Sequence, residues 1–278
     1  MGVTAPDILV HIHIPKCAGT AVRVWLKDAA VERAITGFRA LYPGEHVYLP
    51  SESWPSSSDA RLVAVSTHNI RRFPPQLGVR RLHYFTILRD PRAQAISALR
   101  YTQQERVAFG VPASVGNASI EIARWLLEHT GGEPFENAQT NHIALYEWCD
   151  GTRGRVHPER YGAWPKGERA AYERERLALA KTLLQTFITV GTAERLAESL
   201  HVLRTRSAGF GVNLLPVDRV TIANVTEIPE DDDISWIDHD PLGARLLESV
   251  AVDYELYAFG RALLEKALVE TNAEAVRA

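Results

Sequence analysis

The sequence predicts an α/β protein in which a mostly parallel β-sheet is covered by helices on both faces. Short apolar segments rich in β-branched residues alternate with longer segments whose apolar residues recur at helical spacing. Several of the apolar segments end in charged residues or proline, as strands do where the chain leaves a sheet. Such alternation is typical of a parallel sheet buried between two helical layers. With 278 residues and 46% hydrophobic content, we expect a single domain spanning residues 1–278.

The first predicted unit is a strand, a loop and a helix. Residues Ile8–Ile14 (ILVHIHI) are mostly apolar and β-branched, and Pro15 follows at once. Proline cannot donate a ladder hydrogen bond, so the strand should stop there. Residues 19–32 then predict a helix, because four residues share one helical face: Val22, Trp25, Leu26 and Ala29.

Two further strands are predicted in the first third of the chain. Residues Arg61–His68 (RLVAVSTH) and Arg81–Asp90 (RLHYFTILRD) both have buried-strand composition and polar ends. Residues 91–104 follow as a helix, with Pro91 at its first position. The Pro- and Ser-rich residues 42–60 predict an exposed loop.

The second half of the chain continues the alternation. Helices are predicted over residues 119–132 and 168–186, a strand over Phe187–Gly191, and a helix from Thr192. The tail from Pro241 onward predicts helix, with an apolar stripe at Val252, Leu256, Phe259 and Leu263. In such sheets ligands bind beyond the carboxyl ends of the strands, where we expect the polar strand ends to converge.

Composition and charge exclude several classes of protein. With 31 Lys+Arg against 34 Asp+Glu, the net charge is −3, so the chain as a whole does not suit nucleic-acid binding. No apolar run reaches the ~20 residues of a membrane span, and no secretion signal is evident. Two cysteines, Cys17 and Cys149, make neither a disulfide framework nor a zinc site. We expect a cytoplasmic protein without nucleic-acid partner, membrane span or metal.

The loop after the first strand has the composition of an anion site. Small residues let backbone N–H groups approach an anion, and the dipole of the following helix favours negative charge. Nucleotide P-loops end in Gly-Lys-Ser/Thr, whereas here the lysine precedes the small residues. The pattern predicts a P-loop-like site for a phosphate or sulfate group, and its alternative is an ordinary strand-to-helix turn. The loop comprises Pro15, Lys16, Cys17, Ala18, Gly19, Thr20 and Ala21.

A second motif follows the strand that ends at Asp90. Arg89 ends this strand and Ser97 lies on the following helix, so a guanidinium fork and a hydroxyl can hold one terminal phosphate together. Asp90 and Pro91 predict a helix cap, which leaves Arg89 available for a ligand.

Taken in this order, the two motifs resemble those of sulfotransferases that use 3′-phosphoadenosine 5′-phosphosulfate (PAPS). They are most similar to the branch that contains the heparan sulfate 2-O- and 6-O-sulfotransferases and bacterial relatives. That branch carries HIPK with small residues and Gly-Thr, as in HIPKCAGTA, and later LRDP with a downstream serine, as in ILRDPRAQAIS. Weaker similarities extend over residues 136–144 (ENAQTNHIA), 187–200 and the C-terminal helix.

The resemblance implies a function for each motif. The loop of residues 15–21 would wrap the 5′-phosphosulfate, and Arg89 with Ser97 would hold the 3′-phosphate, leaving adenosine 3′,5′-bisphosphate as product. Sulfuryl transfer needs charge stabilisation at the leaving phosphate, a role for Lys16, and a base that deprotonates the acceptor. A histidine placed like His68 serves as that base in the branch.

Alternatives remain open for the base and for the whole function. His142 is the reserve base, Glu136 a carboxylate alternative, and His83 a poorer candidate at the start of its strand. The acceptor is expected to be a carbohydrate or small-molecule hydroxyl or amine. The competing functions are a kinase-like phosphoryl transferase, which would require a Mg²⁺-binding P-loop, and a non-catalytic adenosine-bisphosphate-binding protein.

Overall fold

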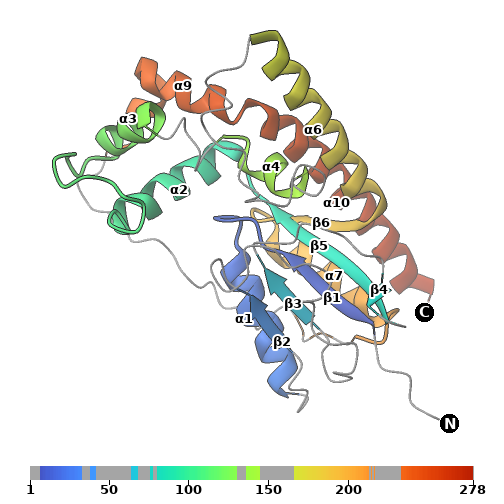
Figure 1. Ribbon diagram of the computed structural model, residues 1–278. Coiled ribbons are helices and arrows are strands. Elements are labelled where there is room, and N and C mark those ends of the chain that lie inside the picture. The colour runs from blue at the N-terminus through green and yellow to red at the C-terminus, as the bar shows by residue number, and fades with distance from the viewer. Residues whose placement is uncertain are drawn as a thin grey trace.

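Five parallel strands form the central sheet of the described part of the chain. The computed structural model describes residues 7–32, 38–41, 64–67, 76–77, 80–129, 136–144, 166–212, 214, 216 and 233–277. The strands lie in the order β2-β3-β1-β5-β6, and a short β4 (Gln76–Leu77) pairs antiparallel with the start of β5 (Figure 1). The parallel strands are β1 (Ile8–Ile12), β2 (Phe38–Leu41), β3 (Ala64–Thr67), β5 (Arg80–Leu88) and β6 (Ile188–Thr192).

Helices cover both faces of this sheet. On one face Ile8, Val10 and Ile12 pack in a cluster with α6 (Lys166–Thr186) and α10 (Ala251–Arg277). The opposite face joins α1 (Gly19–Glu32) and α7 (Leu196–Ala208) in a second cluster, built on Leu9, Phe85 and Ile87. The predicted α/β class, with a parallel sheet between helical layers, is confirmed.

A third group of helices lies beyond the carboxyl end of β5, at the upper left of Figure 1. It comprises α2 (Pro91–Gln104), α3 (Ser119–His129), α8 (Trp236–His239) and α9 (Pro241–Ser249), which share one apolar cluster. The indole of Trp236 donates a hydrogen bond to Ser119 Oγ at 3.0 Å inside it. A further short helix, α4 (Ala138–Ala144), packs against α6 and α10.

Most predicted elements are observed, with shifts at their ends. The helices predicted over residues 19–32 and 91–104 have those bounds, and the stripe around Leu256 faces the core. The first strand ends at Ile12, two residues early. The helix predicted from Thr192 is wrong at its start: Thr192 pairs with Leu88 as the last residue of β6, and α7 begins at Leu196. Elements β2, β4, α4 and α8 were not predicted.

Some expectations are not decided by the described residues. The predicted loop of residues 42–60 lies outside them. The single-domain assignment stays a prediction. In the described part of the chain no helix combines the length and the apolar character needed to cross a membrane.

Gly191 offers a test of the packing of α7 on the sheet. A Cβ at Gly191 would lie 2.4 Å from Ser199 Cβ and 2.8 Å from Ile87 Cδ1, both in the buried interface. Gly191→Ala should therefore lower the free energy of unfolding by about 1–3 kcal/mol, measured by urea denaturation. Gly209→Ala, at the other end of α7 with φ −63°, is the matched control and should change it by less than about 1 kcal/mol. Equal effects of the two variants would contradict the packing argument.

Candidate functional site

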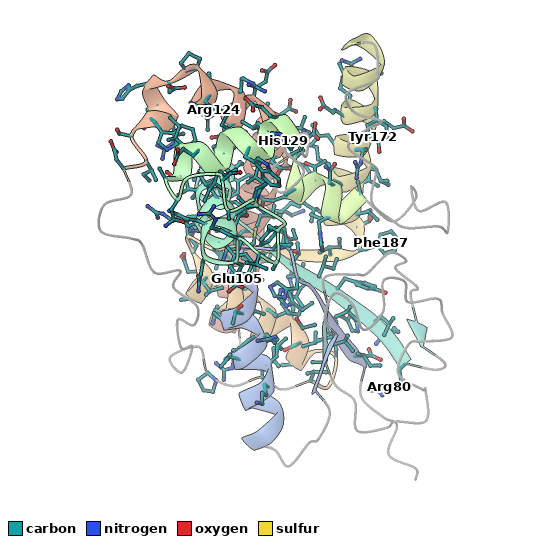
Figure 2. The ribbon with its side chains drawn as sticks, turned by 60° about the vertical axis from the view of Figure 1, so that its left-hand side comes forward. Arg80, Glu105, Arg124, His129, Tyr172 and Phe187 are labelled. Atoms are coloured by element: carbon teal, nitrogen blue, oxygen red, sulfur yellow. The ribbon has the colours of Figure 1, made fainter. Side chains whose placement is uncertain are left out.

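The parallel register brings the two motifs to the same edge of the sheet. Ile12 at the end of β1 pairs with Thr86, whose hydroxyl donates to the Ile12 carbonyl at 2.9 Å. Pro15 and Arg89 each follow three residues later in the chain, so the two motifs begin at the same edge of the sheet. In Figure 2, Arg80 labels the first residue of β5 and Glu105 the residue that follows α2, and the second motif belongs to the chain between these two residues.

The loop before α1 contains two residues in the left-handed region. Lys16 has φ +63° and Ala18 has φ +58°, although neither is glycine. Such a conformation costs about 1–2 kcal/mol per residue. Two backbone bonds frame the turn, from Cys17 N to the Ile14 carbonyl at 3.3 Å and from Val22 N to the Ala18 carbonyl at 3.2 Å. Strain of this kind persists where the surroundings hold it, commonly at ligand sites.

Gly19, at the start of α1, lies close to the ring of His13, the residue that follows β1. A Cβ at Gly19 would lie 1.8 Å from His13 Cδ2. The His13 ring stacks on the His11 ring with 5.3 Å between their centroids, and the His11 ring stacks on Phe85 with 4.8 Å between centroids. His11 Nδ1 also forms a 2.9 Å hydrogen bond with Ser66 Oγ. His11 and His13 thus form a row of stacked rings with Phe85 that reaches Gly19 of the loop.

Arg89 joins the second motif to the first. Its Nη1 donates to the carbonyl oxygen of Lys16 at 3.0 Å. Gln94 adds a parallel tie, because its Nε2 donates to the Pro15 carbonyl at 2.9 Å. Burial, and next the positive charge of Arg89, lowers the pKa of Lys16. The arrangement thus holds two cationic side chains at the start of the loop.

One face of α2 is directed at the loop. Gln94, Ser97 and Tyr101 are spaced i, i+3 and i+7, which places them on a common helical stripe. Gln94 donates a hydrogen bond to the Pro15 carbonyl, and the Nζ of Lys16 lies 4.3 Å from the ring centroid of Tyr101. Ser97 lies between these two residues on the stripe, and its role at a phosphate stays a prediction. Gln94 and Tyr101 were not predicted, although their helical spacing from Ser97 could have indicated them.

The capping prediction for the second motif is confirmed. Asp90 Oδ1 accepts a hydrogen bond from Ala93 N at 2.9 Å, and Pro91 is the first helical residue. Glu194 accepts a hydrogen bond from Asp90 N at 2.9 Å. Arg92, by contrast, points to the exposed carboxylate of Asp238 at 2.7 Å and is not part of the loop contacts.

A buried polar network supports Arg89 from behind. Gln139 on α4 accepts a hydrogen bond from Arg89 N at 2.9 Å and donates one to the Arg89 carbonyl at 2.7 Å. The backbone of α4 in turn donates to the fully buried carboxylate of Asp253 on α10. Burial raises the pKa of Asp253 to about 6, against the hydrogen bonds from Thr140 and Gln139, which lower it. In the sequence, Asp253 is marked only as a charged residue beside an apolar helical stripe.

Cys17 is a packing residue. Its side chain is 1% exposed and lies in the apolar cluster of β1 and α10. Burial raises the pKa of its thiol well above the usual range, so the thiol stays protonated near neutral pH.

The four candidate bases lie in different parts of the chain, and the structure describes three of them. His68 lies outside the described residues. His83 binds Asp7 through Nε2 at 2.8 Å and stacks on Phe210, near the amino end of β5 and away from the loop. Glu136 is buried next to α4, and His142 lies on that helix. Among the described residues no cluster of three His, Cys, Asp or Glu could hold a metal ion.

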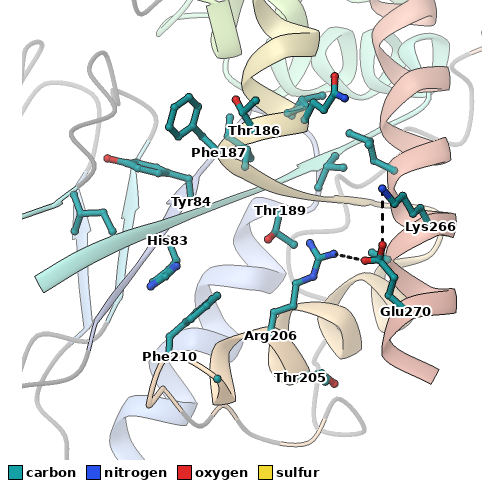
Figure 3. Close-up of a pocket in the computed structure, with 18 of the residues that line it drawn as sticks. His83, Tyr84, Thr186, Phe187, Thr189, Thr205, Arg206, Phe210, Lys266 and Glu270 are labelled. Atoms are coloured by element: carbon teal, nitrogen blue, oxygen red, sulfur yellow. Dashed lines mark hydrogen bonds and ion pairs between the residues drawn. The ribbon is translucent and has the colours of Figure 1, made fainter. Parts of the chain in front are cut away.

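A cavity of about 740 Å³ opens at the opposite end of the sheet from the two motifs (Figure 3). It lies at the amino ends of β5 and β6, and His83 and Phe210 line one side of it. Its basic residues Arg206 and Lys266 both pair with Glu270, at 3.2 and 3.9 Å. We do not assign the site to this cavity, because ligands of parallel sheets bind at the carboxyl ends of the strands.

The buried Asp253 predicts a pH dependence of stability. Its ordinary pKa is 3.8 and burial raises it to about 6, so the folded protein holds this proton more tightly than the unfolded chain. The free energy of unfolding should therefore fall by on the order of 2–3 kcal/mol as pH rises from about 4 to 6. The Asp253→Asn variant should lack this pH-dependent fall in the free energy of unfolding. Urea denaturation of both proteins at several pH values measures the difference, and identical pH profiles would contradict it.

The comparisons with known proteins identify no family for this chain. A scan against protein-family models finds no match, and a search of curated proteins finds no significant match. The resemblance to PAPS-dependent sulfotransferases therefore rests on the two motifs, and the function that follows from it is a proposal.

Proposed function

We propose that the protein is a sulfotransferase that moves a sulfuryl group from PAPS to a hydroxyl or amine of a carbohydrate or small-molecule acceptor. The observation that carries the proposal is the hydrogen bond from Arg89 Nη1 to the Lys16 carbonyl at 3.0 Å. It brings the lysine-first loop and the arginine–serine motif together, as a ligand with separate 5′ and 3′ anionic groups requires.

The chemistry of the assembled residues suits such an anion. The first turn of α1 leaves its backbone N–H groups without intrahelical partners, and they point away from the helix at the loop. Lys16 and Arg89 lie close enough for like-charge repulsion to lower the pKa of Lys16. A bound anion would relieve that repulsion, so the juxtaposition of two cations favours a phosphate or sulfate ligand over a cation.

Each residue can be given a task in the proposed reaction. PAPS supplies an activated sulfuryl group whose leaving group is a phosphate. Arg89 uses one guanidinium N–H for the loop, and its fork together with the Ser97 hydroxyl would hold the 3′-phosphate. Lys16, now lying over Tyr101, would turn toward the reacting group and neutralise the charge that develops on the leaving oxygen. His68 stays the proposed base for in-line attack by the acceptor.

Ligand binding tests the anion site directly. We expect the protein to bind adenosine 3′,5′-bisphosphate more tightly than adenosine 5′-phosphate, measured by isothermal titration calorimetry. Arg89→Ala and Ser97→Ala should each remove most of this preference. The arginine variant should lose about 10- to 150-fold in affinity, as expected when a hydrogen bond to a charged group is removed. Arg92→Ala is the matched control and should bind normally, because Arg92 faces Asp238. Absence of binding by the unmodified protein would overturn the proposal.

Turnover tests the catalytic assignments. With labelled PAPS and a panel of sugar, alcohol and amine acceptors, Lys16→Ala should lower kcat by roughly 10²–10³-fold. His68→Ala should lower it by roughly 10²–10⁴-fold, while the affinity for adenosine 3′,5′-bisphosphate is largely retained. Normal transfer by His68→Ala would exclude His68 as the base and direct the same assay to His142 and Glu136. Phosphate transfer from ATP would favour the kinase alternative instead.

A further inference from the structure

The carboxylate of Asp253 lies at the start of a chain of hydrogen bonds that ends at the anion loop. Its Oδ1 accepts from Thr140 N at 2.8 Å and from Thr140 Oγ1 at 2.6 Å, and its Oδ2 accepts from Gln139 N at 3.0 Å. These donors belong to the first turn of α4. Asp253 therefore fixes both the position and the rotation of α4 relative to α10.

Gln139 carries this constraint to the end of β5. Its side-chain amide pairs with the backbone of Arg89, accepting from the N–H at 2.9 Å and donating to the carbonyl at 2.7 Å. The pair of bonds resembles one rung of a strand ladder and holds the Arg89 backbone just after the last strand residue, Leu88. A rotation of α4 would move this amide and release the backbone of Arg89.

Arg89 carries the constraint into the loop. Its guanidinium donates to the carbonyl of Lys16, which has a left-handed backbone. The direction of this carbonyl depends on the peptide between Lys16 and Cys17, and this peptide lies within the turn before α1. We propose that Asp253 is a positioning residue for the anion site, acting through Gln139 on Arg89 and through Arg89 on the loop of residues 15–21.

Burying the Asp253 carboxylate costs free energy, which indicates that this residue does more than attach α4 to α10. Asp253 is 0% exposed, and an ionised carboxylate is expensive to bury. A second attachment of α4 to the same region exists: Asn137 N donates to the Ser249 carbonyl at 2.9 Å, and Asn137 Oδ1 accepts from Val252 N at 3.0 Å. Because this attachment does not depend on Asp253, loss of the carboxylate should misplace Gln139 without releasing the helix.

The chemistry of asparagine allows a selective test. Asp253→Asn has the same shape, keeps one acceptor oxygen for the two Thr140 donors, and places an NH₂ group where Gln139 N–H needs an acceptor. We expect faster amide hydrogen exchange in residues 15–21, by roughly 2- to 30-fold, and a loss of adenosine 3′,5′-bisphosphate affinity in the same range. Thr140→Val is the matched control, since it removes one donor and leaves the Gln139 bonds in place, so its loop should exchange normally.

A double-mutant cycle separates positioning from general destabilisation. Gln139→Ala should reproduce the effect of Asp253→Asn on exchange in residues 15–21, and the double variant should show no further increase. Ser119→Ala removes a buried hydrogen bond to Trp236 in a different cluster and controls for a loss of stability alone. Additive effects in the cycle, or normal exchange of the loop in Gln139→Ala, would overturn the proposal. The Gln139→Ala variant tests the positioning proposal even if Asp253→Asn does not fold.

The catalytic meaning of this inference rests on the proposed function, but its structural part does not. If the unmodified protein binds no adenosine 3′,5′-bisphosphate, the proposed function fails, while hydrogen exchange still decides whether Asp253 positions the loop. If the ligand binds and loop exchange in the Asp253 and Gln139 variants stays normal, the positioning role fails and the proposed function stands.

Discussion

The hydrogen bond from Arg89 to the Lys16 carbonyl joins two segments that are 73 residues apart in the chain. Neither segment forms a two-part anion site by itself. The loop before α1 offers backbone N–H groups and Lys16. The end of β5 is followed by Arg89, and Ser97 lies on the next helix, α2. The bond requires the strand ends to lie at one level, and this in turn requires the pairing of Ile12 with Thr86. The geometry of the candidate site is thus a consequence of sheet register.

Two positively charged side chains, Lys16 and Arg89, lie close together at the site and determine which ligands its charge favours. Burial and the positive charge of Arg89 both lower the pKa of Lys16, and the guanidinium of Arg89 donates to the Lys16 carbonyl. The nearest acidic groups have other tasks: Asp90 caps α2, Glu194 binds the backbone of Asp90, and Asp253 anchors α4. An anion is the ligand that this distribution of charge favours.

Rigid support explains how the loop keeps two non-glycine residues with positive φ. The stacked rings of His13, His11 and Phe85 reach the loop at Gly19, where a Cβ would lie 1.8 Å from His13 Cδ2. Gln94 and Arg89 hold the carbonyls of Pro15 and Lys16. Strain in the loop is balanced by packing and hydrogen bonds elsewhere, which is the usual condition for a preorganised binding site.

Local signals in the sequence were sufficient for the elements that carry the motifs. The Asp90–Pro91 cap and helical spacing correctly predicted the helices of residues 19–32 and 91–104, because each signal acts between near neighbours. These local signals failed at Thr192, where pairing with Leu88 extends a strand. They also gave no indication of α4 or of the contacts that Asp253 makes with it. Those features depend on contacts between segments far apart in the chain. The sequence by itself therefore determined the helices that carry the motifs, and the anion-binding residues and His68 as the base remain predictions from it. Only the tertiary structure decided that Lys16, Arg89 and the Ser97 face of α2 meet, because register and helix packing bring them to one edge of the sheet.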